Sequence, residues 1–127
     1  MKTIWIVDDD EEMLRAVQLL IKLLGMQSRP FLAARPAGLE LLAGKRPDLL
    51  LLDVSMPEVS GMDMLDFLKK RQDLKDIPVV MLSTEAAEVQ VELALSMGAD
   101  AYITKPVFLN ELETTIRKAF QAHGIKI

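Results

Sequence analysis

Short apolar runs alternate along the chain with longer segments in which apolar residues recur at helical spacing. Compact runs rich in leucine or β-branched residues predict buried strands, whereas a return every three or four positions predicts amphipathic helices. The predicted strands cover Ile4–Val7, Ser28–Ala33, Asp48–Asp53, Ile77–Leu82 and Ala101–Thr104. The predicted helices cover Met13–Leu24, Pro36–Ala43, Gly61–Arg71, Glu85–Met97 and a final segment that opens at Asn110.

Residue types at the element ends refine this pattern. Gly25 stands where the first helix should end in a left-handed residue. Asn110, followed three residues later by Glu113, has the spacing of a capping box. Pro30 has no N–H to donate to a neighbouring strand, which predicts an edge position for the second strand.

Regular alternation of strands and helices predicts an α/β fold with a parallel sheet covered by helices on both faces. A chain of 127 residues predicts a single domain, residues 1–127. Sheets of this kind bind their ligands at the carboxyl ends of the strands. The residues that follow the strands are therefore the candidate functional site.

Polar side chains follow four of the predicted strands. They are Asp8 and Asp9 after the first strand, Asp53 at the end of the third, Ser83 and Thr84 after the fourth, and Lys105 after the fifth. Three neighbouring carboxylates would raise one another's pKa values and destabilise the fold. Mg²⁺ relieves this repulsion, since it binds one or two carboxylates and leaves room for phosphate oxygens. The sequence therefore predicts a magnesium site.

The acidic run after the first strand serves two purposes. Asp10, Glu11 and Glu12 suit an N-cap and the positive end of a helix dipole. Asp8 and Asp9 precede the helix and face the predicted crevice, where metal binding explains them. A carboxylate such as Asp53 can attack a phosphoryl donor, and the transfer then needs positioning and charge neutralisation. Magnesium, Lys105 and a hydroxyl group supply that neutralisation.

Composition narrows the possible partners. The chain has 15 basic and 19 acidic residues, and the net charge of −4 argues against direct nucleic-acid binding. The absence of cysteine excludes disulfides and thiolate metal sites. No apolar stretch approaches the roughly 18 residues of a membrane span, and the N-terminus lacks a signal-peptide pattern. We expect a cytoplasmic protein without membrane contact.

Four motifs in order, "VDDD", "LLLLDVSMPEVSG", "IPVVMLST" and "YITKP", resemble those of bacterial response-regulator receiver domains. The resemblance runs from Lys2 to about Gln121. It implies a flavodoxin-like fold of five strands, in the order 2-1-3-4-5, and five helices. That order places the second strand at an edge, in agreement with Pro30.

The resemblance also implies site roles. Asp53 matches the phosphoacceptor and a metal ligand. Asp9 matches a direct Mg²⁺ ligand and Asp8 one that acts largely through water, while the backbone carbonyl of Ser55 completes the metal site. The remaining matches are Ser83 for the hydroxyl that follows the phosphoryl group, Lys105 for its ammonium partner, Tyr102 for the switch aromatic, and Met56, Pro57 and Gly61 for the loop that shapes the site.

The implied function belongs to a two-component system or phosphorelay. A histidine kinase or phosphotransfer protein would phosphorylate Asp53 with Mg²⁺. The surface of the fourth helix, fifth strand and fifth helix would then change its binding of a downstream effector, and a homodimer through the same face is possible. Slow self-dephosphorylation is also implied, without conventional enzyme activity. The sequence departs from the family pattern at three positions: Ser83 replaces threonine, Thr84 replaces a smaller residue, and Val107 replaces phenylalanine. These departures would affect the lifetime of the phosphoryl group and the amplitude of the switch.

Alternatives stay open at this point. The spacing of Asp8 and Asp10 also occurs in haloacid-dehalogenase-like phosphatases, and an interaction module could keep the fold without phosphorylation. Thr84 competes with Ser83 as the switch hydroxyl, and Tyr102 could be an ordinary strand tyrosine. Apolar residues in the helix predicted over Glu85–Met97 exceed one buried stripe, which indicates either deep burial or a docking surface. The chain could be a stand-alone protein or part of a longer regulator.

Overall fold

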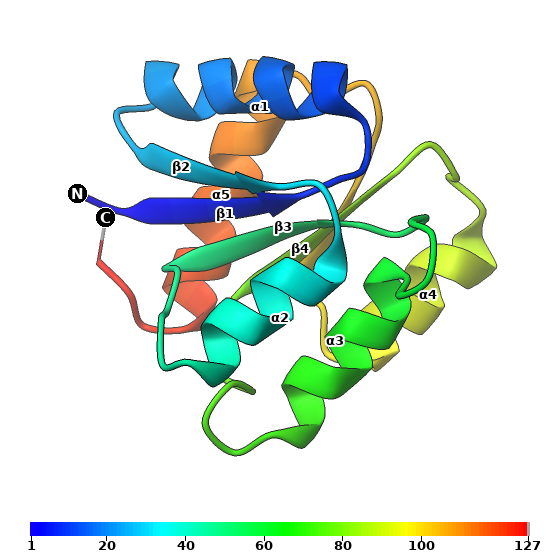
Figure 1. The fold of residues 1–127 in the computed structure, drawn as a ribbon. Helices are drawn as coiled ribbons and strands as arrows, with labels where there is room; N and C mark the ends of the chain where they lie inside the picture. The colour runs from blue at the N-terminus through cyan, green and yellow to red at the C-terminus, as the bar shows by residue number, and fades with distance from the viewer. Residues whose placement is uncertain (127) are drawn as a thin grey trace.

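The computed structural model of the protein describes residues 1–126 and contains one five-stranded parallel sheet, in the order β2-β1-β3-β4-β5. The strands are β1 (Thr3–Val7), β2 (Gln27–Phe31), β3 (Leu49–Asp53), β4 (Val79–Ser83) and β5 (Ala101–Thr104). The helices are α1 (Glu11–Leu23), α2 (Ala34–Leu42), α3 (Gly61–Lys70), α4 (Glu88–Ser96) and α5 (Leu109–Ala122). The predicted flavodoxin-like fold, including its strand order, is confirmed (Figure 1).

Helices cover both faces of the sheet, with α1 and α5 on one side and α2, α3 and α4 on the other (Figure 1). Successive residues of a strand therefore enter different cores. Ile4 and Ile6 of β1 pack with α1 and α5, whereas Trp5 and Val7 pack with the opposite layer. Each fully buried leucine or isoleucine stabilises the fold by about 1.5–3 kcal/mol. This two-sided burial explains why the central strands are apolar throughout.

Strand β2 lies at the edge of the sheet, as Pro30 predicts. Within residues 1–126 its only strand neighbour is β1, with Ile6 opposite Pro30 in the register. The missing N–H of Pro30 is therefore compatible with the ladder. The predicted Asp10 cap of α1 is also confirmed, because its side chain accepts the backbone N–H groups of Glu12 and Met13.

Four helix starts differ from the sequence prediction, and α1 and α2 each begin two residues earlier than predicted, at Glu11 and Ala34. Helix α4 begins at Glu88 instead of Glu85, because the backbone of Glu85 bonds to other groups described below. The capping box predicted at Asn110 is wrong. Helix α5 already begins at Leu109, and its N-cap, Phe108, makes no side-chain cap hydrogen bond.

A capping box occurs instead at the start of α3. Ser60 accepts the backbone N–H of Asp63, and the Asp63 carboxylate accepts the N–H of Ser60. This box fixes the first turn of α3 directly after the loop that follows β3.

Over residues 1–126, none of the helices combines the length and hydropathy that a membrane span needs.

Candidate phosphoacceptor and metal site

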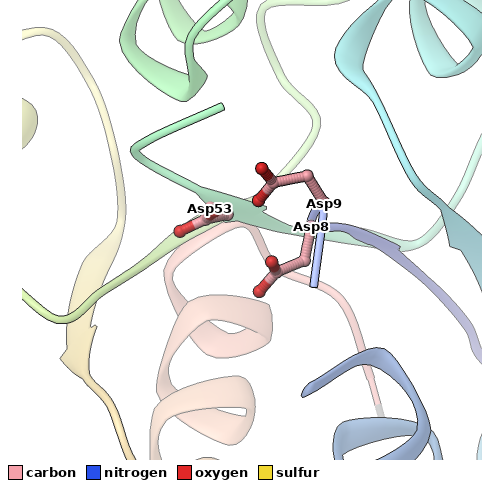
Figure 2. A group of neighbouring side chains, drawn as sticks. All are labelled: Asp8, Asp9 and Asp53. Atoms are coloured by element: carbon pink, nitrogen blue, oxygen red, sulfur yellow. The ribbon is translucent and has the colours of Figure 1, made fainter. Parts of the chain in front are cut away.

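The acidic residues meet because β1 and β3 are neighbours in register. Val7 pairs with Leu52, so Asp8 and Asp53 follow side by side at the carboxyl ends of the two strands. Asp8, Asp9 and Asp53 each offer a carboxylate oxygen, and these oxygens lie within 4.8 Å of one another. Figure 2 shows the three side chains at this one edge of the sheet.

Lys105 reaches the same edge from β5. Ser83 pairs with Thr104, and the backbone N–H of Lys105 donates to the Ser83 carbonyl over 2.7 Å. The Lys105 Nζ lies 2.8 Å from Oδ2 of Asp8 and 3.2 Å from Oδ1 of Asp53. The Lys105–Pro106 peptide bond that follows is cis. Residues far apart in the sequence thus form one cluster of two buried carboxylates and an ammonium group.

Burial and charge set the protonation of this cluster. Asp8 is fully buried and Asp53 is only 4% exposed. Burial, with the neighbouring Asp8 carboxylate, raises the pKa of Asp53 to about 6, although Lys105 acts in the opposite direction. Burial disfavours the charged form of Lys105, but the Asp8 and Asp53 carboxylates outweigh it and raise the pKa of the amine. The negative charge therefore exceeds what one ammonium group neutralises.

The donor set fits a hard divalent cation. Three carboxylates that supply oxygens within 4.8 Å of one another are ligands of the type that Mg²⁺ prefers. Asp9 is exposed, while Asp8 and Asp53 are buried, so the cluster is open to solvent on one side. Ser55, the fourth predicted contributor, is exposed in the loop after β3. A bound cation would offset the Asp8 charge that, together with burial, raises the pKa of Asp53.

The loop after β3 passes very close to the acceptor. A Cβ atom at Gly61 would lie 2.0 Å from the backbone oxygen of Asp53, well inside contact distance. The N–H of Gly61 donates to the Val54 carbonyl over 2.9 Å, which ties the start of α3 to the end of β3. The family resemblance implied that Gly61 helps to shape the site, and this close approach explains why the residue is glycine.

Ser83 and Tyr102 are connected through one backbone unit. The Ser83 Oγ accepts the N–H of Glu85 over 2.9 Å, and the Tyr102 hydroxyl donates to the Glu85 carbonyl over 2.8 Å. Ser83 is buried and Thr84 is exposed, which favours Ser83 as the hydroxyl near the acceptor. The role of Glu85 has no signal in the sequence, because its contribution is made by backbone atoms that every residue type except proline could provide.

Comparison with known proteins agrees with this geometry. The family model described as response regulator receiver domain matches residues 4–117. The polar-differentiation response regulator DivK of Brucella anthropi is 34% identical over 119 residues, which cover 91% of this chain and 94% of DivK. The chain therefore belongs to the family of response regulator receiver domains, the class of domain used in two-component signalling.

Other relatives contain this domain within longer chains. The transcriptional regulatory protein CseB of Streptomyces avermitilis is 34% identical over 125 residues, which cover 93% of this chain but 50% of CseB. The chain thus spans about half the length of that relative. Among solved structures, the signal receiver domain of a signal transduction histidine kinase from Syntrophus aciditrophicus is 30% identical, with a TM-score of 0.84. The match covers 96% of this chain and 92% of that one.

Proposed function

We propose that this receiver domain accepts a phosphoryl group on Asp53 in a reaction that requires Mg²⁺. The observation that carries the proposal is the environment of Asp53. It is a buried carboxylate at a strand end, with Lys105 at 3.2 Å and the carboxylates of Asp8 and Asp9 beside it. No ordinary structural role requires three acids and a lysine at one point. A phosphoryl group and a cation explain all four residues.

In the proposed reaction, an Asp53 oxygen attacks the phosphorus atom of the donor. A P–O bond to Asp53 forms as the bond between phosphorus and the donor's leaving group breaks, and the electron pair of that bond leaves with the donor. Asp8, Asp9, Asp53 and the Ser55 carbonyl would hold Mg²⁺, which neutralises phosphoryl oxygens when bound. Lys105, already within reach of Asp53, would pair with another phosphoryl oxygen.

The new dianion would favour a second arrangement of the nearby hydroxyl group. If Ser83 turns towards the phosphoryl group, it releases the N–H of Glu85 that it now accepts. Because Glu85 also accepts the Tyr102 hydroxyl, the change reaches the surface of α4, β5 and α5. A covalent group that contacts one arrangement better than the other shifts the population of the two.

The proposed partners follow from this chemistry. The phosphoryl donor would be a histidine kinase or phosphotransfer protein in the cytoplasm, and the recipient of the signal a protein that binds the α4–β5–α5 surface. The mass of the intact protein tests the first step. Incubation with acetyl phosphate and Mg²⁺ should add one phosphoryl group to the wild type and to Asp66→Asn, a control at a half-exposed carboxylate on α3. EDTA or Asp53→Asn should prevent the addition.

This experiment and a phosphatase assay separate the two rival functions. An unlabelled wild type would support an interaction module that does not use phosphorylation. Repeated hydrolysis of an added phosphoester, such as p-nitrophenyl phosphate, would support a phosphatase that uses Asp8 and Asp10. The proposal expects neither result.

A further inference from the structure

Helix α4 exposes more apolar surface than its packing requires. Of its nine residues only Ala94 is buried. Val89, Leu93 and Leu95 are 78%, 49% and 45% exposed, so deep burial of the helix is excluded for these three. Val89 and Leu93 are one turn apart on the same side of the helix. An exposed apolar face of this kind marks an interaction surface.

The charge of this segment has one sign. No lysine, arginine or histidine occurs from Asp76 through Thr104. Glu85, Glu88 and Glu92 accompany the exposed apolar residues and form no ion pair with any residue between 1 and 126. Acidic residues elsewhere, such as Glu40 and Asp66, have basic neighbours. The carboxylates of Glu88 and Glu92 on α4 are therefore available to a partner, whereas Glu85, just before the helix, also accepts the backbone N–H of Ala87 over 2.9 Å.

We propose that this α4 surface, made of Val89, Leu93 and Leu95 with Glu85, Glu88 and Glu92, binds a protein segment that combines apolar side chains with lysine or arginine, as a basic amphipathic helix does. The apolar residues would provide the contact area, and the unpaired carboxylates would select a positive partner. Only the dependence of this binding on phosphorylation rests on the proposed function.

Charge also distinguishes this partner from a second copy of the chain. A two-fold symmetric contact places the same patch on both sides of the interface. A dimer built on α4 would bring the glutamates of the two copies together, and like charges across an interface disfavour association. A homodimer through this face, which the family resemblance also implied, is therefore expected to form less readily than a complex with a positively charged partner.

The position of Glu85 connects the surface to the site. Its N–H donates to Ser83, and its carbonyl accepts Tyr102, so the acidic surface begins at the residue that joins these two side chains. Helix α4 lies at the outer margin of the molecule, where a partner can reach it (Figure 1). A movement of the Ser83 side chain would thus alter the backbone at one end of the α4 surface.

Binding of a defined probe tests the proposal. The probe is a fluorescent helical peptide of leucine and lysine, with leucines along one side, and its counterpart carries glutamate in place of lysine. Anisotropy titrations use the full chain, before and after acetyl phosphate treatment, with the phosphorylated fraction measured by mass. Glu88→Gln/Glu92→Gln should weaken lysine-peptide binding about threefold to tenfold. Leu93→Ser should weaken it by about tenfold.

Matched variants control for net charge and exposed leucine. Glu12→Gln/Asp76→Asn removes the same charge from exposed positions elsewhere, and Leu39→Ser removes a leucine that is 60% exposed on α2. Both should bind the lysine peptide like the wild type. Equal losses in the two double variants, or equal binding of the glutamate peptide, would overturn the proposal, as would an α4-dependent dimer that excludes the peptide. These results do not depend on phosphorylation, so an unlabelled Asp53 would contradict only the proposed function.

Discussion

The Nζ of Lys105 lies 3.2 Å from Oδ1 of Asp53, although the two residues are 52 positions apart. The same ammonium group lies 2.8 Å from the fully buried Asp8. Two strands deliver the carboxylates and a third delivers the lysine. Lys105 therefore neutralises part of the charge of the acidic cluster.

We predict that Lys105→Met lowers the free energy of unfolding in EDTA at neutral pH by about 3 kcal/mol, because it leaves a buried carboxylate without a partner. Urea unfolding measures the change. Lys118→Met, at an exposed position of α5, should stay within about 0.5 kcal/mol of the wild type. Equal stability of the two variants would show that the lysine does not compensate Asp8.

Gly61→Ala should disturb both stability and the acceptor. The added Cβ would lie 2.0 Å from the Asp53 carbonyl oxygen, so the backbone must shift, and we expect a loss of about 2 kcal/mol or more. Gly38→Ala is the matched control. Position 38 lies inside α2, and apart from its chain neighbours and the adjacent helix backbone no atom of residues 1–126 lies within 4 Å of the new Cβ, so alanine should be neutral there or stabilise by up to about 1 kcal/mol. Similar melting of the two variants would refute the close approach.

The raised pKa of Asp53 predicts a pH dependence of stability without metal. A carboxyl group whose pKa rises from 3.8 to about 6 on folding contributes stability below pH 3.8, and this is lost as the pH rises through 6. In EDTA, the wild type should therefore lose about 1–3 kcal/mol relative to Asp53→Asn between pH 4 and pH 7. Urea unfolding of both proteins across this range measures the difference. Parallel profiles would contradict the raised pKa.

Magnesium should reverse that loss. We predict that millimolar Mg²⁺ raises the melting temperature of the wild type at neutral pH by a few degrees, since a ligand that binds only the folded state stabilises it. Asp9→Asn, which removes an exposed carboxylate from the cluster, should reduce the increase, and Asp66→Asn should not. An unchanged melting temperature in EDTA and in Mg²⁺ would be evidence against a metal site.

The sequence predicted the sheet and the site edge because periodicity and strand-end chemistry are local signals. Apolar strands that end in Asp53, Ser83 and the acidic pair after β1 predict where these groups meet once the sheet is parallel. The strand order was implied by resemblance to a family, and Pro30 alone indicated which strand lies at an edge. The register of β1 and β3 then brings Asp8 beside Asp53.

The features that the sequence did not reveal depend on backbone atoms. Helix α4 starts late because Ser83 and Tyr102 bond to the backbone of Glu85, and no residue type signals such bonds. Asn110 has the composition of a cap, but α5 begins one residue earlier, at Leu109. Ser60 and Asp63 form the capping box that was overlooked, since aspartate takes the place that glutamate usually fills.

Locating the modified residue shows whether residue 53 carries the phosphoryl group. Borohydride reduction converts an aspartyl phosphate to homoserine, which tandem mass spectrometry places in the sequence. After acetyl phosphate and Mg²⁺ treatment, we predict homoserine at position 53 in the wild type and none in EDTA. Homoserine at position 8 or 9 instead, or at no position, would contradict it.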